Sequence, residues 1–225
     1  MKIICIGRNY RDHAAELKNA IPEEPVIFMK PESAILPPGI AFRLPQFSKE
    51  IHHEIEVVLR LGNPVSGPGN SGIQQKLPAA DLNTNPNRKR ALDCIESVTV
   101  GLDFTARDLQ NKLKANGLPW EKAKAFDGSA VLGTWMPAAD LDLNDLSISL
   151  RINDEERQSG HCRDLLFDFA YLISYISQFF TLQPGDLIFT GTPAGVGPVK
   201  AGDVLIGMLN GKGLFSLNIT DDIAS

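Results

Sequence analysis

The feature that most constrains the fold is a series of short strand-like runs in the C-terminal half. Four apolar runs lie at residues 148–152, 187–190, 204–209 and 214–219. The dipeptide Asn210-Gly211 separates the last two, and it is typical of a tight hairpin because both positions accept positive φ. We therefore expect an antiparallel hairpin near the C-terminal end.

Strands are expected to dominate the whole chain. Further strand-like runs lie at residues 2–6, 26–29, 54–61 and 98–102. Helical character is confined to residues 10–18, 105–115 and 165–180. Because strands and helices do not alternate regularly, the sequence predicts an α+β, β-rich fold with few helices, with antiparallel or mixed sheets, in preference to a doubly wound parallel sheet.

Residues 62–90 have the composition of a loop. They are crowded with Gly, Pro, Asn and Ser and offer little apolar surface to bury. We expect a mobile loop there. The basic cluster Arg88-Lys89-Arg90 is too short to indicate a nucleic-acid site and is interpreted as part of this solvated loop.

Charge and cysteine content exclude several classes of function. The net charge of −5 argues against nucleic-acid and anionic-membrane partners, which require clustered Lys and Arg. The three cysteines form no closely spaced pair, so reduced thiols are expected. No segment approaches ~18 unbroken apolar residues, and the N-terminal apolar run is too short for a signal peptide. These features together predict a cytoplasmic protein.

Glu54 and Glu56 form the most informative pair of charged residues. Residues two apart on a strand point to the same face, so both carboxylates project together. Two like charges at this spacing repel unless a cation or solvent separates them. The pattern fits either a metal site or a half-exposed strand with its polar face in water.

Asp103 follows an apolar strand and precedes a helix. It can act as a helix N-cap, or it can complete an all-oxygen set with Glu54 and Glu56. Three carboxylates without His or Cys ligands favour Mg²⁺ or Mn²⁺, with Ca²⁺ as a weaker alternative.

Six blocks of sequence, in the same order, resemble the fumarylacetoacetate hydrolase superfamily and in particular its short members. The resemblance covers nearly the whole chain. The blocks are residues 7–13 (GRNYRDH), 28–31 (FMKP), 53–56 (HEIE), 102–110 (LDFTARDLQ), 118–124 (LPWEKAK) and 190–198 (TGTPAGVGP).

This resemblance implies a single catalytic domain over residues 1–225, built of packed mixed β-sheets and forming a homodimer. It implies Mg²⁺ or Mn²⁺ held by Glu54, Glu56 and Asp103, and a lid within residues 1–25. Members of the family cleave C–C bonds of acylpyruvates, decarboxylate oxaloacetate, or isomerise related oxo-acids. The segment between Glu56 and Asp103 is longer here than the resemblance leads us to expect, and the excess lies in the 62–90 loop.

A 2-oxo acid that chelates the cation can form an enolate, whose charge the cation stabilises. An anionic substrate also needs positive side chains nearby. Arg107, at the start of a helix four residues after Asp103, can reach back toward the site. Lys124 joins it by resemblance, although by pattern alone it fits a surface lysine. Gln110, one turn beyond Arg107, can hydrogen-bond substrate or remain an exposed helical residue.

His13 and Glu16 share a helical face and form the candidate base. By pattern alone they fit a polar surface helix; by resemblance they sit on the lid and activate water. Thr192 lies in a glycine-rich loop that cannot be a dinucleotide site, because no clear helix follows. The loop fits a turn cluster by pattern, while the resemblance implies that Thr192 contacts a substrate carboxylate.

Three functions therefore remain open. The first is a metal-dependent acylpyruvate hydrolase or oxaloacetate decarboxylase. The second is an isomerase or tautomerase of the same oxo-acids, since the His13–Glu16 pair can move a proton without hydrolysis. The third is a non-catalytic binding protein on the same fold.

Overall fold

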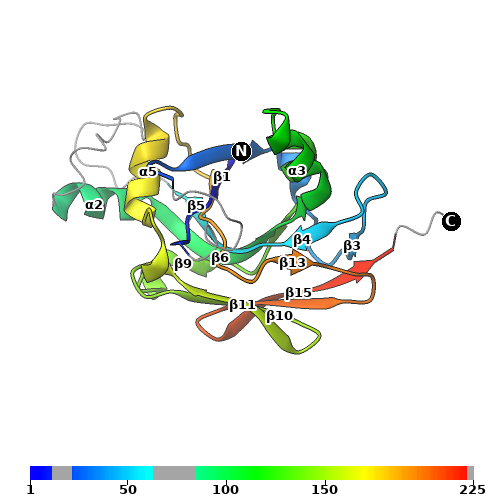
Figure 1. Ribbon diagram of the computed structural model, residues 1–225. Coiled ribbons are helices and arrows are strands. Elements are labelled where there is room, and N and C mark those ends of the chain that lie inside the picture. The colour runs from blue at the N-terminus through cyan, green and yellow to red at the C-terminus, as the bar shows by residue number, and fades with distance from the viewer. Residues whose placement is uncertain (12–21, 63–84, 222–225) are drawn as a thin grey trace.

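A computed structural model describes residues 1–11, 22–62 and 85–221 (Figure 1). Its largest sheet has the strand order β2-β1-β12-β5-β6-β8, with β9 also paired to β6. The sheet is mixed, because β1 and β12 are parallel while the other neighbours are antiparallel. Its strands are β1 (Ile3–Gly7), β2 (Val26–Lys30), β5 (Ile55–Leu61), β6 (Ile95–Asp103), β8 (Ala130–Leu132), β9 (Met136–Pro137) and β12 (Leu187–Phe189).

A second sheet of five strands lies below the first in the view of Figure 1. Its order is β11-β10-β14-β15-β3. The predicted hairpin joins β14 to β15 as antiparallel neighbours, and its turn residues Asn210 and Gly211 have φ of 48° and 75°. Its strands are β3 (Phe42–Arg43), β10 (Ser147–Ile152), β11 (Glu155–His161), β14 (Val204–Leu209) and β15 (Lys212–Thr220).

A third, small sheet has the order β13-β4-β7, from β13 (Gly197–Pro198), β4 (Ile51–His53) and β7 (Thr105–Ala106). Glu54 links β4 to β5, and Phe104 links β6 to β7. The chain therefore passes between the small sheet and the large one at the two places where the predicted carboxylates lie.

Four α-helices occur among the described residues: α2 (Asn85–Leu92), α3 (Arg107–Ala115), α4 (Glu121–Lys124) and α5 (Phe169–Ser177). Short 3₁₀ helices lie at Glu32–Ala34, Ala138–Asp140 and Cys162–Asp164. The β-rich α+β prediction is confirmed. The helix predicted over 165–180 is shorter than expected, and it begins after Asp168, whose side chain accepts a hydrogen bond from Tyr171 N as an N-cap.

The loop predicted over residues 62–90 is wrong for its last part, because residues 85–90 belong to α2. Pro86 lies in the first turn of this helix, where its missing N–H costs no hydrogen bond and its fixed φ suits a helix. Composition alone predicts a loop here, because this proline adds to the Gly, Pro, Asn and Ser content of the stretch. Residues 63–84 lie outside the described residues, and so do residues 12–21, where most of the helix predicted over 10–18 would fall.

The core lies between the two large sheets. Its buried side chains come from strands of both sheets, such as Val57 and Val100 on one and Leu150 and Leu205 on the other, and α5 contributes Leu172. All three cysteines are free and buried, as predicted. No helix within the described ranges is long and apolar enough to cross a membrane.

Candidate active site

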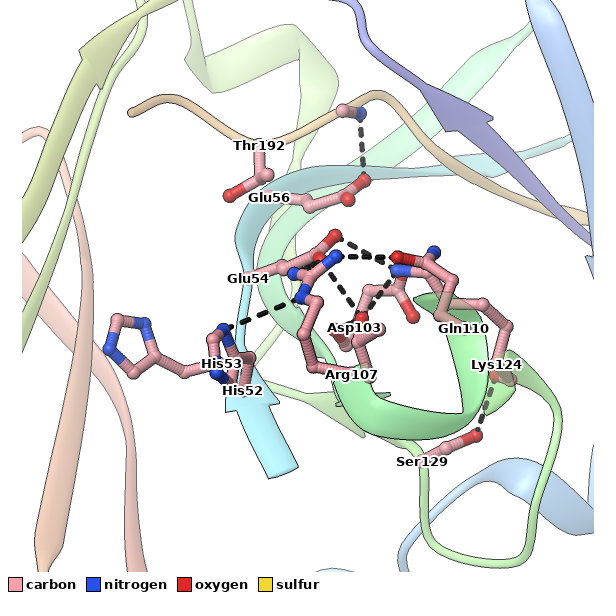
Figure 2. A network of polar contacts seen from close by, with 12 residues as sticks. His52, His53, Glu54, Glu56, Asp103, Arg107, Gln110, Lys124, Ser129 and Thr192 are labelled. Carbon is pink, nitrogen blue, oxygen red and sulfur yellow. Dashed lines mark hydrogen bonds and ion pairs between the residues drawn. The ribbon is translucent and has the colours of Figure 1, made fainter. Parts of the chain in front are cut away.

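Glu54, Glu56 and Asp103 converge where β5 meets β6 (Figure 2). The register pairs Ile55 with Leu102, which brings Asp103 opposite Glu54, and Asp103 N donates to Glu54 O at 2.9 Å. One carboxylate oxygen from each residue lies within 4.8 Å of the others. All three residues are at most 6% exposed. The antiparallel register therefore concentrates three carboxylates in one buried place.

Lys124 lies between two of these carboxylates. Its Nζ is 2.9 Å from Glu54 Oε2 and 2.5 Å from Asp103 Oδ2, and it donates to Thr105 Oγ1 at 2.6 Å. The two carboxylates raise the pKa of Lys124 to about 12, against the opposing effect of its burial. Lys124 is therefore a charged ammonium, supplied by the short helix α4.

Arg107 compensates Glu54 from the other side. Its guanidinium donates to Glu54 Oε1 at 2.5 Å and to Gln110 Oε1 at 2.6 Å. Arg107 and Gln110 are buried near the start of α3, and Gln110 orients the arginine. Both residues also line the pocket above the carboxylates.

Lys30 is a third buried cation at this site. Its Nζ lies 2.8 Å from Asp103 Oδ1 and 2.9 Å from Ser129 Oγ, and it also contacts the carbonyl of Lys124. Lys30 and Asp103 form an ion pair, but its geometry does not make a hydrogen bond. Asp103 Oδ1 therefore accepts no hydrogen bond from any described residue. Oδ1 thus keeps a lone pair available for a further cation.

Glu56 lacks a cationic partner at short range among the described residues. Its Oε2 accepts a hydrogen bond from Gly191 N at 2.7 Å. Burial raises the pKa of Glu56 well above its usual value, and the charges of Asp103 and Glu54 add to this effect. A bound dication would reverse it, because it would stabilise all three ionised carboxylates. The all-oxygen donor set and this like-charge crowding both fit a hard divalent cation.

The loop after β12 reaches Glu56 because position 191 is glycine. Gly191 has φ of 104°, and a Cβ there would lie 2.6 Å from the Cβ of Asn9. The amide of Gly191 therefore comes close enough to donate a hydrogen bond to the carboxylate of Glu56.

Gln158, on β11 of the five-stranded sheet, joins this loop to the strand that carries the carboxylates. Its Oε1 accepts hydrogen bonds from His53 Nδ1 at 2.8 Å and Ile55 N at 3.1 Å. Its Nε2 donates to Thr192 Oγ1 at 2.8 Å and Pro193 O at 2.9 Å. Burial lowers the pKa of His53, so this ring is neutral with its proton on Nδ1.

A pocket opens above the carboxylates, with Thr192 on its wall. Side chains from β1, β2, α3 and α4 complete the lining. The lining residues are Ile6, Gly7, Arg8, Phe28, Glu54, Glu56, Asp103, Arg107, Gln110, Lys114, Trp120, Lys124 and Thr192.

Comparison with known proteins identifies the family. The family model described as "Fumarylacetoacetate (FAA) hydrolase C-terminal" matches residues 2–216 of this chain. The chain belongs to the fumarylacetoacetate hydrolase family.

Relatives within this family differ in the reaction they are named for. The chain is 39% identical to the oxaloacetate tautomerase YcgM of Escherichia coli, over 95% of this chain and 90% of that protein. It is 36% identical to a fumarylpyruvate hydrolase of Pseudomonas aeruginosa, solved with Mn²⁺ and pyruvate. That match covers 99% of this chain and 90% of the other, with a TM-score of 0.84.

A third relative is a 5-carboxymethyl-2-hydroxymuconate delta-isomerase of Mycobacterium smegmatis. It is 35% identical, with a TM-score of 0.79, over 99% of this chain and 80% of that one. Family members similar to this chain thus include a tautomerase, a hydrolase and an isomerase.

Seven of the nine site residues predicted from the sequence lie together around one pocket of this family member. They are Glu54, Glu56, Asp103, Arg107, Gln110, Lys124 and Thr192. The other two, His13 and Glu16, lie outside the described residues.

Sequence reasoning missed the parts played by Lys30 and Gln158. Lys30 carried a signal, as a charged residue ending an apolar strand-like run within the FMKP block. Gln158 carried none, since its stretch, Glu155-Glu156-Arg157-Gln158, reads as an exposed polar segment.

Proposed function

We propose that this chain is a Mg²⁺- or Mn²⁺-dependent enzyme that forms the enolate of a small 2-oxo acid, with oxaloacetate tautomerisation as its reaction. The observation that carries the proposal is the buried set of Glu54, Glu56 and Asp103, surrounded by three cations. The choice of reaction rests on the similarity to an oxaloacetate tautomerase over nearly the whole chain.

Charge balance supports an anionic substrate. A dication among the three carboxylates leaves one negative charge, which Lys30, Arg107 and Lys124 more than offset. When bound, the cation stabilises the negative charge that develops on the 2-oxo oxygen. The site as a whole is then positive and suited to a dianion.

Lys124 and Arg107 take on the role of orienting the substrate. Both now donate to the carboxylates through which a dication would bind, so a bound ion would compete for these oxygens. Each side chain lines the pocket and can turn its remaining N–H groups toward the substrate. Gln110 fixes the guanidinium plane of Arg107.

Tautomerisation needs a base that removes a carbon-bound proton and, once protonated, returns it to the enolate oxygen. We assign the base to His13, with Glu16 fixing its tautomer, by resemblance and by the titration range of imidazole. Thr192 is proposed to contact a substrate carboxylate. Its hydroxyl oxygen accepts a hydrogen bond from Gln158 Nε2, which leaves the hydroxyl hydrogen available to donate toward the pocket.

Hydrolysis of acylpyruvates is the second candidate, favoured by the similarity to a fumarylpyruvate hydrolase. The leaving group when water attacks the acyl carbon is the enolate of pyruvate, a 2-oxo acid enolate like that of oxaloacetate, so the two reactions can share one site. Decarboxylation of oxaloacetate would also release this enolate. The catalytic domain over residues 1–225, the homodimer and the cytoplasmic location stay predictions.

A panel assay with oxaloacetate, acetylpyruvate and fumarylpyruvate tests the proposal, with enol absorbance and pyruvate release followed separately. We expect the rate of enol–keto interconversion of oxaloacetate to fall to the uncatalysed rate after chelation and to be restored by Mg²⁺ or Mn²⁺. Asp103→Asn should abolish the return, whereas Asp127→Asn, at an exposed acid on a nearby loop, should not. Full activity in protein shown by elemental analysis to be metal-free would contradict the mechanism.

A further inference from the structure

Three polar residues share the pocket face of helix α3. Arg107, Gln110 and Lys114 follow the i, i+3, i+7 spacing that places side chains on one helix face, and all three line the pocket. Arg107 and Gln110 have been placed beside the carboxylates. Lys114 lies two turns beyond Arg107 and lines the pocket, but it has been given no role so far.

Lys114 is directed into the pocket, although a lysine in the last turn of a helix normally extends into water. Its neighbour Lys112 in the same turn is exposed, whereas Lys114 is half-buried. The ammonium lies 5.1 Å from the centre of the Trp120 ring, and Trp120 contacts Phe28 with ring centroids 6.1 Å apart. This aromatic wall holds the Lys114 charge over the pocket.

No carboxylate of the described residues lies within ion-pair distance of the Lys114 ammonium, although positive charges surround it. Burial, together with the charges of Arg8 and Arg107, lowers the pKa of Lys114 to about 8, while the charge of Glu54 opposes this shift. Positive charges collected in a partly desolvated pocket are costly unless an anion joins them.

Arg8 approaches the same pocket from the end of β1. Its φ of 61° lies in the left-handed region, which costs energy for a residue with a side chain. Asn9 pins the adjoining backbone through hydrogen bonds to Phe167 O and Thr190 O. Strained backbone of this kind is often retained where a side chain must be aimed at a ligand.

We propose that Arg8 and Lys114 bind the second carboxylate of a 2-oxo dicarboxylic acid whose 2-oxo end is held at Glu54, Glu56 and Asp103. This rests on the proposed function, which supplies the position of the 2-oxo end. Residues 107 and 114 are about 10 Å apart along the helix axis, and helical side chains lean toward the N-terminus. The Lys114 ammonium therefore comes back toward Arg107, which leaves the span of a short carbon chain between the two ends.

The subsite predicts selection among substrates. Dicarboxylic 2-oxo acids gain a charge-assisted contact that monocarboxylic ones such as pyruvate lack.

Calorimetric titration of the Mg²⁺-loaded protein tests the subsite with two non-reactive probes. Oxalate offers only the chelating end, while N-oxalylglycine adds a carboxylate on a two-atom NH–CH₂ arm. We expect Lys114→Met to lower the affinity for N-oxalylglycine by about tenfold or more, while the affinity for oxalate changes by about twofold or less. Lys114→Arg should restore most of the loss. Arg8→Met should act in the same direction as Lys114→Met, and Lys112→Met, at the exposed neighbour, should change neither probe.

Two outcomes would overturn the subsite. An equal loss of affinity for both probes in Lys114→Met would mean that the lysine acts only through the electrostatic field of the pocket. Unchanged affinity for N-oxalylglycine would mean that Lys114 does not contact the second carboxylate. In either case oxalate still binds the wild-type protein and the proposed function stands. Failure of oxalate to bind the Mg²⁺-loaded wild type would instead overturn the proposed function, and the subsite with it.

Discussion

Lys30 Nζ lies 2.8 Å from Asp103 Oδ1, with the two side chains 0% and 1% exposed. The same ammonium contacts the carbonyl of Lys124, at the end of α4. One lysine on β2 thus holds both a proposed metal ligand and the short helix that supplies a pocket cation. Neither residue is near Lys30 in the sequence.

We predict that Lys30→Met destabilises the protein by about 3–5 kcal/mol, because it leaves the buried Asp103 charge short of a partner. Urea denaturation measures the loss. Lys2→Met is the matched control. Lys2 also pairs with a buried aspartate, Asp186, but the Lys2 side chain itself is 30% exposed. Asp186 keeps hydrogen bonds from Lys2 N and Gln183 N, so the control should lose much less. Equal losses in the two variants would contradict this account.

Gln158→Leu is predicted to cost about 2–4 kcal/mol of unfolding free energy, because Ile55 N and Pro193 O lose a buried partner. The KM for the best substrate should rise as Thr192 loses its anchor. Gln183→Leu, at an exposed glutamine, should stay within about 0.5 kcal/mol of wild type. A Gln158→Leu protein of normal stability and normal KM would show that the two sheets are held together elsewhere.

His13→Ala and Glu16→Ala are predicted to lose turnover but to keep Mg²⁺ and oxalate binding, since the base acts on a proton that oxalate does not carry. His13→Ala should lose about 10²–10⁴-fold in kcat, and Glu16→Ala less. Stopped-flow kinetics and calorimetry on the same preparations separate the two effects. Near-normal turnover in either variant would remove the pair from the mechanism.

Binding of N-oxalylglycine is predicted to weaken as pH rises from 7 to 9. The pKa of Lys114 is lowered to about 8 by its burial and by the charges of Arg8 and Arg107, so the ammonium loses its proton across this range. Lys124 and Glu54 also act on this ammonium, with opposite signs. Well below pH 8 the Lys114 ammonium is charged, near pH 8 about half of it is charged, and the affinity should fall with this charged fraction.

Lys114→Arg should flatten this profile, because arginine keeps its proton up to about pH 12. Oxalate titrated over the same range reports any change at the metal end. A wild-type profile for N-oxalylglycine that follows oxalate throughout would show that Lys114 does not titrate against the ligand.

Local pattern was enough to predict how the carboxylates are placed, while their interpretation as one metal site came from the family resemblance. The two-residue period of a strand placed Glu54 and Glu56 on one face, and the strand end placed Asp103 near a helix that carries Arg107 and Gln110. These inferences use neighbours within one element, where geometry is fixed by backbone period. The Asn210-Gly211 hairpin was predictable for the same reason.

The contacts that complete the site depend on pairing between distant strands. Gln158 reaches His53 across 105 residues, and Lys30 reaches Ser129 across 99. Which strands become neighbours is decided by the packing of the whole core, so no local pattern shows which partners these two residues contact. Helix α2 was missed because a Pro-containing start was taken for a loop, although proline suits the first turn.

Arg107, Gln110 and Lys114 lie along one face of α3, so the distance between the first and the last of them sets the length of substrate that fits. The helix thus acts as a gauge of substrate length. The carboxylates and the start of the helix fix one end of the gauge, and the position of the last cation sets the other. Moving that cation from position 114 to 111 would shorten the gauge by about 4.5 Å without disturbing the residues at its fixed end. Related enzymes could in this way diverge in the size of acid they accept while their bond-making chemistry stays the same.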